Sequence, residues 1–292
     1  MPAFWTDEVR VRVPATSANL GPGFDSAGLA LTLYDDVAVR LLDSGLVVEV
    51  EGEGADDVPR DESHLVVRSL RRAFERLGGQ PPGLHVSCIN RIPHARGLGS
   101  SSAAICAAIV AAQALVGDAS LDLLALADEL EGHPDNVAAC LRGGATFAWG
   151  SPVQLLRVEP HADLAPVAFV PPTQSSTHTV RAMLPAQVPF ADAAANAGRA
   201  ALLPTALSTS PELLLAATED RLHQQYRAPA MPDSAALVAA LRADGIPAAV
   251  SGAGPTVLAL TTVGTAARVA ARSPQGWTAR QLQVDRRGAA VR

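Results

Sequence analysis

The chain has 292 residues, of which 48% are hydrophobic and 18% are charged, which excludes a largely disordered protein and allows about two domains. Its 23 basic residues are all arginine, and with 29 acidic residues the net charge is −6, which tells against a nucleic-acid-binding protein. The lack of lysine in the sequence excludes a Schiff base, a pyridoxal aldimine and the lysine of a P-loop or of a protein kinase.

Cysteine and hydrophobic patterns indicate the compartment. Cys88, Cys106 and Cys140 lie far apart and form no C-x-x-C pair, so we expect buried, reduced thiols instead of disulfides or a zinc site. The longest apolar stretch, Ala103–Val116, is interrupted by Gln113 and is too short to cross a bilayer. No signal-peptide pattern is visible. We therefore expect a soluble, cytoplasmic protein that works without a membrane.

In the first part of the chain, short apolar and alternating segments predict strands over Val9–Val13, Leu29–Arg40, Leu46–Gly52 and residues 83–93. We expect the first strand to end at Pro14 and a glycine-rich loop to follow over residues 14–28. The segment Leu46–Gly52 is the natural pairing partner for Leu29–Arg40. Helical spacing predicts helices over His64–Leu77, Ser102–Val116 and Leu121–Leu130.

In the later part of the chain, Leu164–Pro172 is typical of a buried strand and opens a second half of the molecule. Residues 247–260, "PAAVSGAGPTVLAL", predict two strands joined by a glycine turn. Paired strands with interspersed helices favour an α+β fold over a doubly wound parallel sheet.

The segment "GLGSSSAA", Gly97–Ala104, joins a predicted strand to a predicted helix. Gly97 and Gly99 allow positive φ angles and a close approach of backbone N–H groups to an anion. One of the next three serines is expected to cap the helix, whose N-terminus adds partial positive charge. The segment is neither a Walker loop nor a Rossmann fingerprint. It indicates phosphate binding, although an ordinary capped turn would use the same residues.

A second polar segment, "ELEGHPDN", carries Glu129, Glu131, His133, Asp135 and Asn136 just after a predicted helix. Phosphoryl transfer needs a divalent cation and groups that orient the attacking oxygen; Glu131 suits the first task, and Asp135 or Asn136 the second. One histidine among oxygen ligands suits magnesium better than zinc. A solvated turn in which His133 caps carbonyl groups is the alternative. The glycine turn "SGAGPT", Ser251–Thr256, would alone be read as a plain hairpin.

Three motifs in this order, "PATSANLGPGFDSAGLAL", "PHARGLGSSSAA" and "VSGAGPTVLAL", resemble those of the GHMP kinases over nearly the whole chain. The first motif, with "HPDN", "TVRAMLP" and "LHQQYR", is similar to the branch that phosphorylates homoserine. The resemblance implies an N-terminal domain like ribosomal protein S5 domain 2 over residues 1–162 and a ferredoxin-like domain over residues 163–292. It also implies ATP-dependent formation of O-phospho-L-homoserine from L-homoserine in threonine biosynthesis, and it suggests a homodimer.

The resemblance assigns candidate site residues as well. The nucleotide positions are Pro93, His94, Ala95, Arg96, Gly97, Leu98, Gly99, Ser100, Ser101, Ser102 and Ala103, with His64 where an asparagine often contacts the base. The Mg²⁺ ligands map onto Ser101 and Glu131, and the register among the three serines stays open. The homoserine side maps onto Asn19, Asp25, His133, Asp135, Asn136, Arg181 and Arg227.

The chemistry of homoserine, a zwitterion, agrees with these positions. Its carboxylate calls for paired guanidinium groups, for which Arg181 and Arg227 are the candidates, and its ammonium calls for an acid such as Asp25. The sequence offers no strong general base. We expect Asn136 and the γ-phosphate to orient the hydroxyl, with Asp135 as the alternative base. A GHMP kinase for another small alcohol and a non-catalytic ligand sensor are the competing functions, and a sensor should have lost the metal-binding acid or serine.

Overall fold

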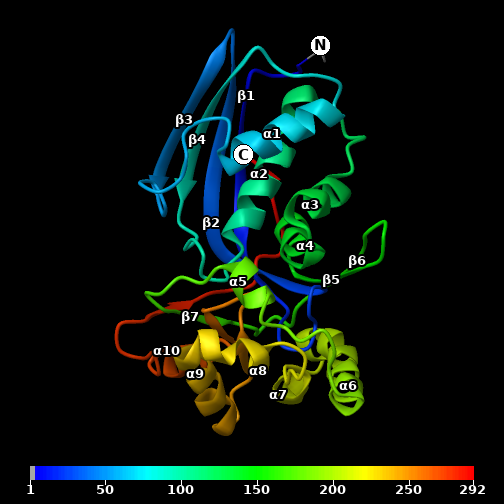
Figure 1. Cartoon of the computed structure of the whole chain (residues 1–292), viewed down its shortest axis with the longest axis vertical. Helices are drawn as coiled ribbons and strands as arrows, with labels where there is room; N and C mark the ends of the chain where they lie inside the picture. Colours follow the sequence, from blue (N-terminus) through cyan, green and yellow to red (C-terminus); the bar gives the residue numbers. More distant parts are fainter. Residues whose placement is uncertain (1–3) are drawn as a thin grey trace.

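The computed structural model describes residues 4–292 and contains two β-sheets with helices packed against them (Figure 1). The larger sheet has the order β11-β1-β2-β4-β3, and β5 and β6 extend it from one end of β2. Its strands are β1 (Glu8–Ala18), β2 (Ala27–Leu42), β3 (Gly45–Gly52), β4 (Gly83–Asn90), β5 (Ala145–Trp149), β6 (Gln154–Val158) and β11 (Ala290–Val291). The two sheets and their helices confirm the α+β class.

Strand β1 continues four residues beyond Pro14, so the predicted strand end was wrong. The pairing register with β2 shifts between Pro14 and Ala15. Such a bulge tolerates a residue without an N–H group, which explains why proline does not end the strand. As a result Thr16 and Ser17 lie in a buried strand, and the first motif is a loop only after Ala18.

Strand β3 pairs in parallel with β4, so its predicted pairing with β2 was also wrong. Over residues 36–40, both edges of β2 are occupied by other strands. Arg40 of β2 lies opposite Glu8 of β1 on one side and opposite His85 of β4 on the other. The chain therefore passes from β2 across the position of β4 before it forms β3.

Four helices cover one face of the larger sheet: α1 (Leu65–Arg76), α2 (Ser100–Val116), α3 (Leu123–Glu131) and α4 (Pro134–Arg142) (Figure 1). Small side chains, such as the fully buried Ala107 and Ala111, allow α2 to pack closely against β1 and against the other three helices. The three cysteines are buried and free, as predicted. Helices α1 to α3 confirm the predicted helices to within two residues.

Helix α4 was not predicted, since its sequence was interpreted as a turn. Pro134 at its first position and Asp135 in its first turn are N-terminal helix signals that the histidine and glycine before them obscured. The helix matters because it fixes two of the candidate site residues at its N-terminus.

The second half has an antiparallel sheet of order β10-β7-β9-β8, with β7 (Val167–Val170), β8 (Ala248–Val250), β9 (Val257–Ala259) and β10 (Thr278–Gln281). The expected strand at Leu164–Pro172 and the strand–turn–strand at residues 247–260 are confirmed. Its helices are α5 (Thr177–Arg181), α6 (Phe190–Ser208), α7 (Leu214–Ala217), α8 (Gln224–Arg227), α9 (Pro232–Ala243) and α10 (Ala266–Ala270). Figure 1 shows α5 at the level where the two halves meet.

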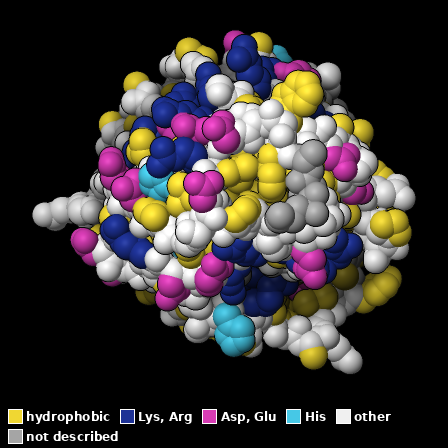
Figure 2. Space-filling model, turned by 90° about the horizontal axis from the view of Figure 1, so that it is seen from above, with side chains coloured by type: hydrophobic (Ala, Val, Ile, Leu, Met, Phe, Trp, Pro, Cys, Tyr) yellow, Lys and Arg dark blue, Asp and Glu magenta, His cyan; other side chains and the backbone are white. Residues whose placement is uncertain are grey.

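The end of the chain returns from the second half to the first, because β11 pairs with β1. The domain border after residue 162 stays a prediction. On the face seen in Figure 2, arginine and acidic side chains lie close to one another and to hydrophobic ones. Within residues 4–292, no helix is both long enough and apolar enough to cross a membrane.

Candidate active site

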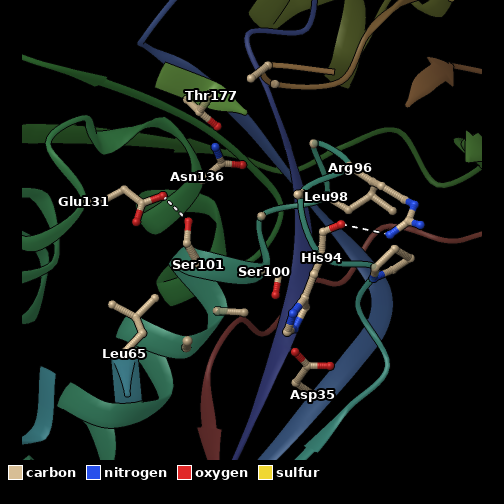
Figure 3. Close-up of a pocket in the computed structure, with 18 of the residues that line it drawn as sticks. Asp35, Leu65, His94, Arg96, Leu98, Ser100, Ser101, Glu131, Asn136 and Thr177 are labelled. Carbon is tan, nitrogen blue, oxygen red and sulfur yellow. Dashed lines mark hydrogen bonds between the residues drawn. The ribbon is translucent and has the colours of Figure 1, made fainter. Parts of the chain in front are cut away.

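A cavity of about 720 Å³ lies where the two halves meet, and its walls include residues of all three glycine-containing motifs. One end is largely apolar and is formed by residues such as Val37, Val58 and Leu65. The segment of residues 97–101 lines the middle. The other end is polar and is lined by Asn19, Asp25, Glu131, His133, Asp135, Asn136, Arg181 and Arg227. Figure 3 shows Leu65 and Asp35 on one side of the serines and Asn136 and Thr177 on the other.

The glycines of residues 97–99 allow this segment to pack tightly against its neighbours. Gly97 and Gly99 have φ angles of +77° and +73°. A Cβ atom on Gly97 would lie 2.2 Å from the carbonyl oxygen of Ser251, and one on Gly99 would lie 2.0 Å from Oγ1 of Thr16. The three motifs therefore meet at this segment, and only glycine fits at either position.

The predicted serine cap of α2 was wrong, because Gly99 is the N-cap residue and no side chain caps the helix. The serines instead occupy the first turn. The hydroxyls of Ser101 and Ser102 each donate a 2.7 Å hydrogen bond to Oε1 of Glu131, at the end of α3. Figure 3 shows Ser101 and Glu131 pointing toward each other in the wall of the cavity.

The other oxygen of Glu131, Oε2, has no hydrogen bond within residues 4–292. That part of the chain also contains no cluster of three His, Cys, Asp or Glu side chains that could hold a metal. One carboxylate beside serine hydroxyls suits Mg²⁺, which takes few protein ligands and keeps waters and phosphate oxygens. Glu129 has a different environment: it forms surface ion pairs with Arg72 and Arg76 at 2.7 and 2.6 Å.

The N-terminus of α4 carries a connected polar group. Nδ1 of His133 lies 2.8 Å from Oδ1 of Asp135, and this contact raises the pKa of His133. The same oxygen accepts the backbone N–H of Asn136 at 2.7 Å. The hydroxyl of Thr16 donates to Oδ1 of Asn136 at 2.8 Å. The alternative interpretation of this segment as a solvated turn was wrong, because Asp135 is only 2% exposed.

Two arginines and one acid surround Phe24 at the polar end. Arg181 donates two 2.7 Å hydrogen bonds to Asp25, one to each oxygen, and this contact raises the pKa of Arg181. Arg227 is 2% exposed, has no acid within ion-pair distance in residues 4–292, and its Nε has no hydrogen-bond partner. Burial lowers the pKa of Arg227, and the charge of Arg181 lowers it further. Both guanidinium groups lie over the Phe24 ring, 5.3 and 5.2 Å from its centre.

Asn19 holds the first loop in place. Its Oδ1 accepts the backbone N–H of Asp25 at 3.0 Å, and its Nδ2 donates to the carbonyl oxygen of Gly252 at 2.9 Å. Asn19 and Asp25 have positive φ angles of 68° and 53°, a strained conformation that these contacts stabilise. The contact of Asn19 with the substrate stays a prediction.

At the apolar end, His64 precedes α1 and is 5% exposed, and its Nδ1 has no hydrogen-bond partner in the part of the chain that the structure describes. Burial lowers the pKa of His64, so the ring is neutral at pH 7. Asp35 accepts the backbone N–H groups of Arg91 and Ile92 at 2.5 and 2.9 Å, and burial raises its pKa to about 6. Arg96 donates to the carbonyl oxygens of His94, Pro171 and Pro172, and so ties this segment to the second half.

Comparisons with known proteins agree with this architecture. Residues 64–144 match the family described as GHMP kinases N terminal domain, and residues 193–277 match GHMP kinases C terminal. The homoserine kinases of Streptomyces avermitilis and Streptomyces coelicolor are 63% and 62% identical to this chain, with 99% of the chain and 97% and 96% of the relatives covered. The chain belongs to the GHMP kinase family. The crystal structure of homoserine kinase from Cytophaga hutchinsonii superposes with a TM-score of 0.89 at 28% identity, with 99% of this chain and 98% of that one covered.

In this GHMP kinase, all of the predicted site residues except Ser102 line the cavity. Ser102 is fully buried and reaches the site only through its bond to Glu131. The sequence pattern did not single out Thr16, Phe24 or Asp35. Thr16 and Phe24 lie inside the first motif. For Asp35, the available signal was the acidic pair Asp35-Asp36 within a predicted strand.

Proposed function

We propose that this kinase transfers the γ-phosphoryl group of ATP to the hydroxyl of L-homoserine. The observation that carries the proposal is Arg227, a buried guanidinium that lines the polar end of the cavity and has no acid partner among residues 4–292. Burying a cation costs free energy unless an anion pairs with it, and the carboxylate of a ligand can do so through charge-assisted hydrogen bonds. The names of the Streptomyces relatives support homoserine as the source of that carboxylate.

The ammonium group of the substrate would bind Asp25. In the structure Asp25 and Arg181 neutralise each other, and Arg227 lies close enough to Arg181 to feel its charge. A bound zwitterion would exchange partners within this group: the ammonium replaces one guanidinium at Asp25, and the carboxylate receives Arg181 and Arg227. A small molecule that carries only an ammonium would leave Arg227 without a carboxylate.

ATP would lie along the cavity with its base at the apolar end, beside the neutral His64, and its phosphates against residues 97–101. Backbone N–H groups and the N-terminus of α2 favour negative charge there, without any lysine. Ser101 and Glu131 would hold Mg²⁺, which when bound offsets charge on the phosphate oxygens. Ser102, buried behind Glu131, supports that carboxylate.

The acceptor hydroxyl would lie near Asn136 and the γ-phosphate. Asp135 is a poor general base in this arrangement, since one of its oxygens already binds His133 and the backbone of Asn136. Positioning and electrostatic stabilisation therefore supply most of the catalysis, as is usual for a loose phosphoryl-transfer transition state. The hydroxyl proton leaves to the transferred phosphoryl group or to water as the new O–P bond forms and the bond to ADP breaks.

The test is a coupled ADP-release assay with L-homoserine, L-serine, shikimate, galactose and mevalonate, each with and without Mg²⁺. We expect Mg²⁺-dependent ADP release with L-homoserine at a kcat/KM at least about 100-fold above that for the other alcohols. Faster turnover of mevalonate or galactose would contradict the proposal. So would ADP release that does not depend on the acceptor.

A further inference from the structure

Thr16 connects the phosphate segment with the acceptor end of the cavity. It lies in β1 and is fully buried. Its backbone N–H donates to the carbonyl oxygen of Leu98 at 3.0 Å, and its hydroxyl donates to Oδ1 of Asn136 at 2.8 Å. Its Oγ1 occupies the space where a side chain on Gly99 would begin, 2.0 Å from that Cβ position. One residue therefore touches both sides of the place where the phosphoryl group would move.

These contacts determine which way the Asn136 amide faces. The hydroxyl of Thr16 occupies Oδ1, and Oδ1 of Asp135 lies 3.5 Å from Nδ2. A carboxylate attracts an amide N–H and repels an amide oxygen, so Asp135 selects this orientation, and the Thr16 hydroxyl holds the amide in it by donating to Oδ1. The 3.5 Å contact is too long to use the Nδ2 donors fully. Asn136 therefore offers an N–H donor to the cavity, where Figure 3 shows its nitrogen and oxygen on opposite sides.

An N–H donor at this position suits the oxygen atoms of the reaction. It can bind a lone pair of the acceptor hydroxyl or an oxygen of the phosphoryl group in transfer. An amide turned by 180° would offer its oxygen instead, which can accept the O–H of the acceptor but repels the oxygens of the phosphoryl group. Without the Thr16 hydroxyl, Oδ1 of Asn136 would lose the hydrogen bond that holds it, and the long contact between Nδ2 and Asp135 would be left to fix the amide.

We propose that Thr16 is a positioning residue that keeps the Asn136 N–H directed at the reacting oxygens and ties this orientation to the phosphate segment through Leu98 and Gly99. The inference rests on the proposed phosphoryl transfer to homoserine. It assigns Thr16 no contact with either substrate. Its loss should therefore affect kcat and leave both KM values nearly unchanged.

The test compares Thr16→Val, which removes the hydroxyl at nearly constant shape, with Thr16→Ser, which keeps it. We expect kcat for homoserine to fall about tenfold or more in Thr16→Val and in Thr16→Ala, and to stay within about threefold of wild type in Thr16→Ser. KM for ATP and for homoserine should stay within about twofold in all three. Thermal unfolding of each variant shows that it is folded at the assay temperature.

Two further variants separate orientation from packing. Thr146 on β5 is also fully buried, but its hydroxyl has no hydrogen-bond partner among the described residues, so Thr146→Val is the matched control and should retain wild-type kcat. In an Asn136→Ala background, Thr16→Val should cause little further loss, because the group it positions is gone.

Three results would overturn the inference while the proposed function stands: Thr16→Val with wild-type kcat, Thr16→Ser as slow as Thr16→Val, or full additivity with Asn136→Ala. A wild-type enzyme that releases no ADP with homoserine would overturn the proposed function, and this inference with it.

Discussion

Arg227 gives the most specific prediction, because stability and substrate affinity should change in opposite directions when it is replaced. Arg227→Met keeps a side chain of similar length and removes a buried charge. Within residues 4–292 the Nε of Arg227 has no partner, and its contacts to His223 and Gly252 are long, both at 3.3 Å. An unsatisfied buried donor costs about 1–3 kcal/mol. The carbonyl of Gly252 keeps its bond from Asn19 after the substitution. We therefore expect the ligand-free variant to be about 1–2 kcal/mol more stable than wild type.

The same substitution removes a charge-assisted hydrogen bond to the substrate carboxylate, which contributes about 1.5–3 kcal/mol. KM for homoserine should rise about 10- to 150-fold, and KM for ATP should change little. Urea unfolding without ligands measures the first effect, and steady-state kinetics the second.

Arg242→Met is the matched control for this prediction. Arg242 is half-buried and also has no acid partner in residues 4–292, but its guanidinium donates to Thr218, Leu215 and Ala248 and does not line the cavity. Its replacement should lower stability, since it leaves these acceptors unpaired, and should not change KM. An Arg227→Met variant that is less stable than wild type, or whose KM for homoserine is unchanged, would contradict this role of Arg227.

Three further predictions concern other parts of the cavity. The pKa of Asp35 is raised by burial to about 6 from 3.8, so its protonated form stabilises the fold and this contribution is lost as pH rises through the folded value. In urea unfolding, the free energy of unfolding of Asp35→Asn should therefore equal that of wild type near pH 4 and exceed it by up to about 3 kcal/mol at pH 7–8. A variant as stable as wild type at both pH values would contradict this. Glu131→Gln should lower kcat by about 100-fold or more and raise the Mg²⁺ concentration needed for half-maximal rate, and an unchanged Mg²⁺ titration would exclude its metal-binding role. Gly99→Ala should lower both stability and kcat, because its Cβ would displace the Thr16 hydroxyl; a variant with wild-type Tm and kcat would show that the segment can move aside.

Local patterns predicted those features that depend on neighbouring residues in the chain. Alternation and helical spacing located most strands and the helices α1 to α3, and the glycine–serine segment pointed to phosphate binding. Features that depend on distant residues were missed. The pairing of β3 with β4 follows from which strand edges are free, and the continuation of β1 through Pro14 follows from a bulge against β2.

The candidate site shows the same division. Residue types and spacing, together with the family resemblance, identified Glu131, Asn136 and the two arginines. They did not indicate that Arg181 is held by Asp25 while Arg227 has no acid partner in the described part of the chain, because that difference depends on which side chains meet across the two halves. The homodimer and the cytoplasmic location stay predictions.

The most direct test of the account is to identify the product. Wild-type enzyme incubated with ATP, Mg²⁺ and L-homoserine can be followed by phosphorus NMR and mass spectrometry. We predict a phosphate monoester of homoserine in an amount equal to the ADP formed, with neither produced by Glu131→Gln at a comparable rate. ADP accompanied only by inorganic phosphate, or no ADP at all, would contradict phosphoryl transfer to homoserine.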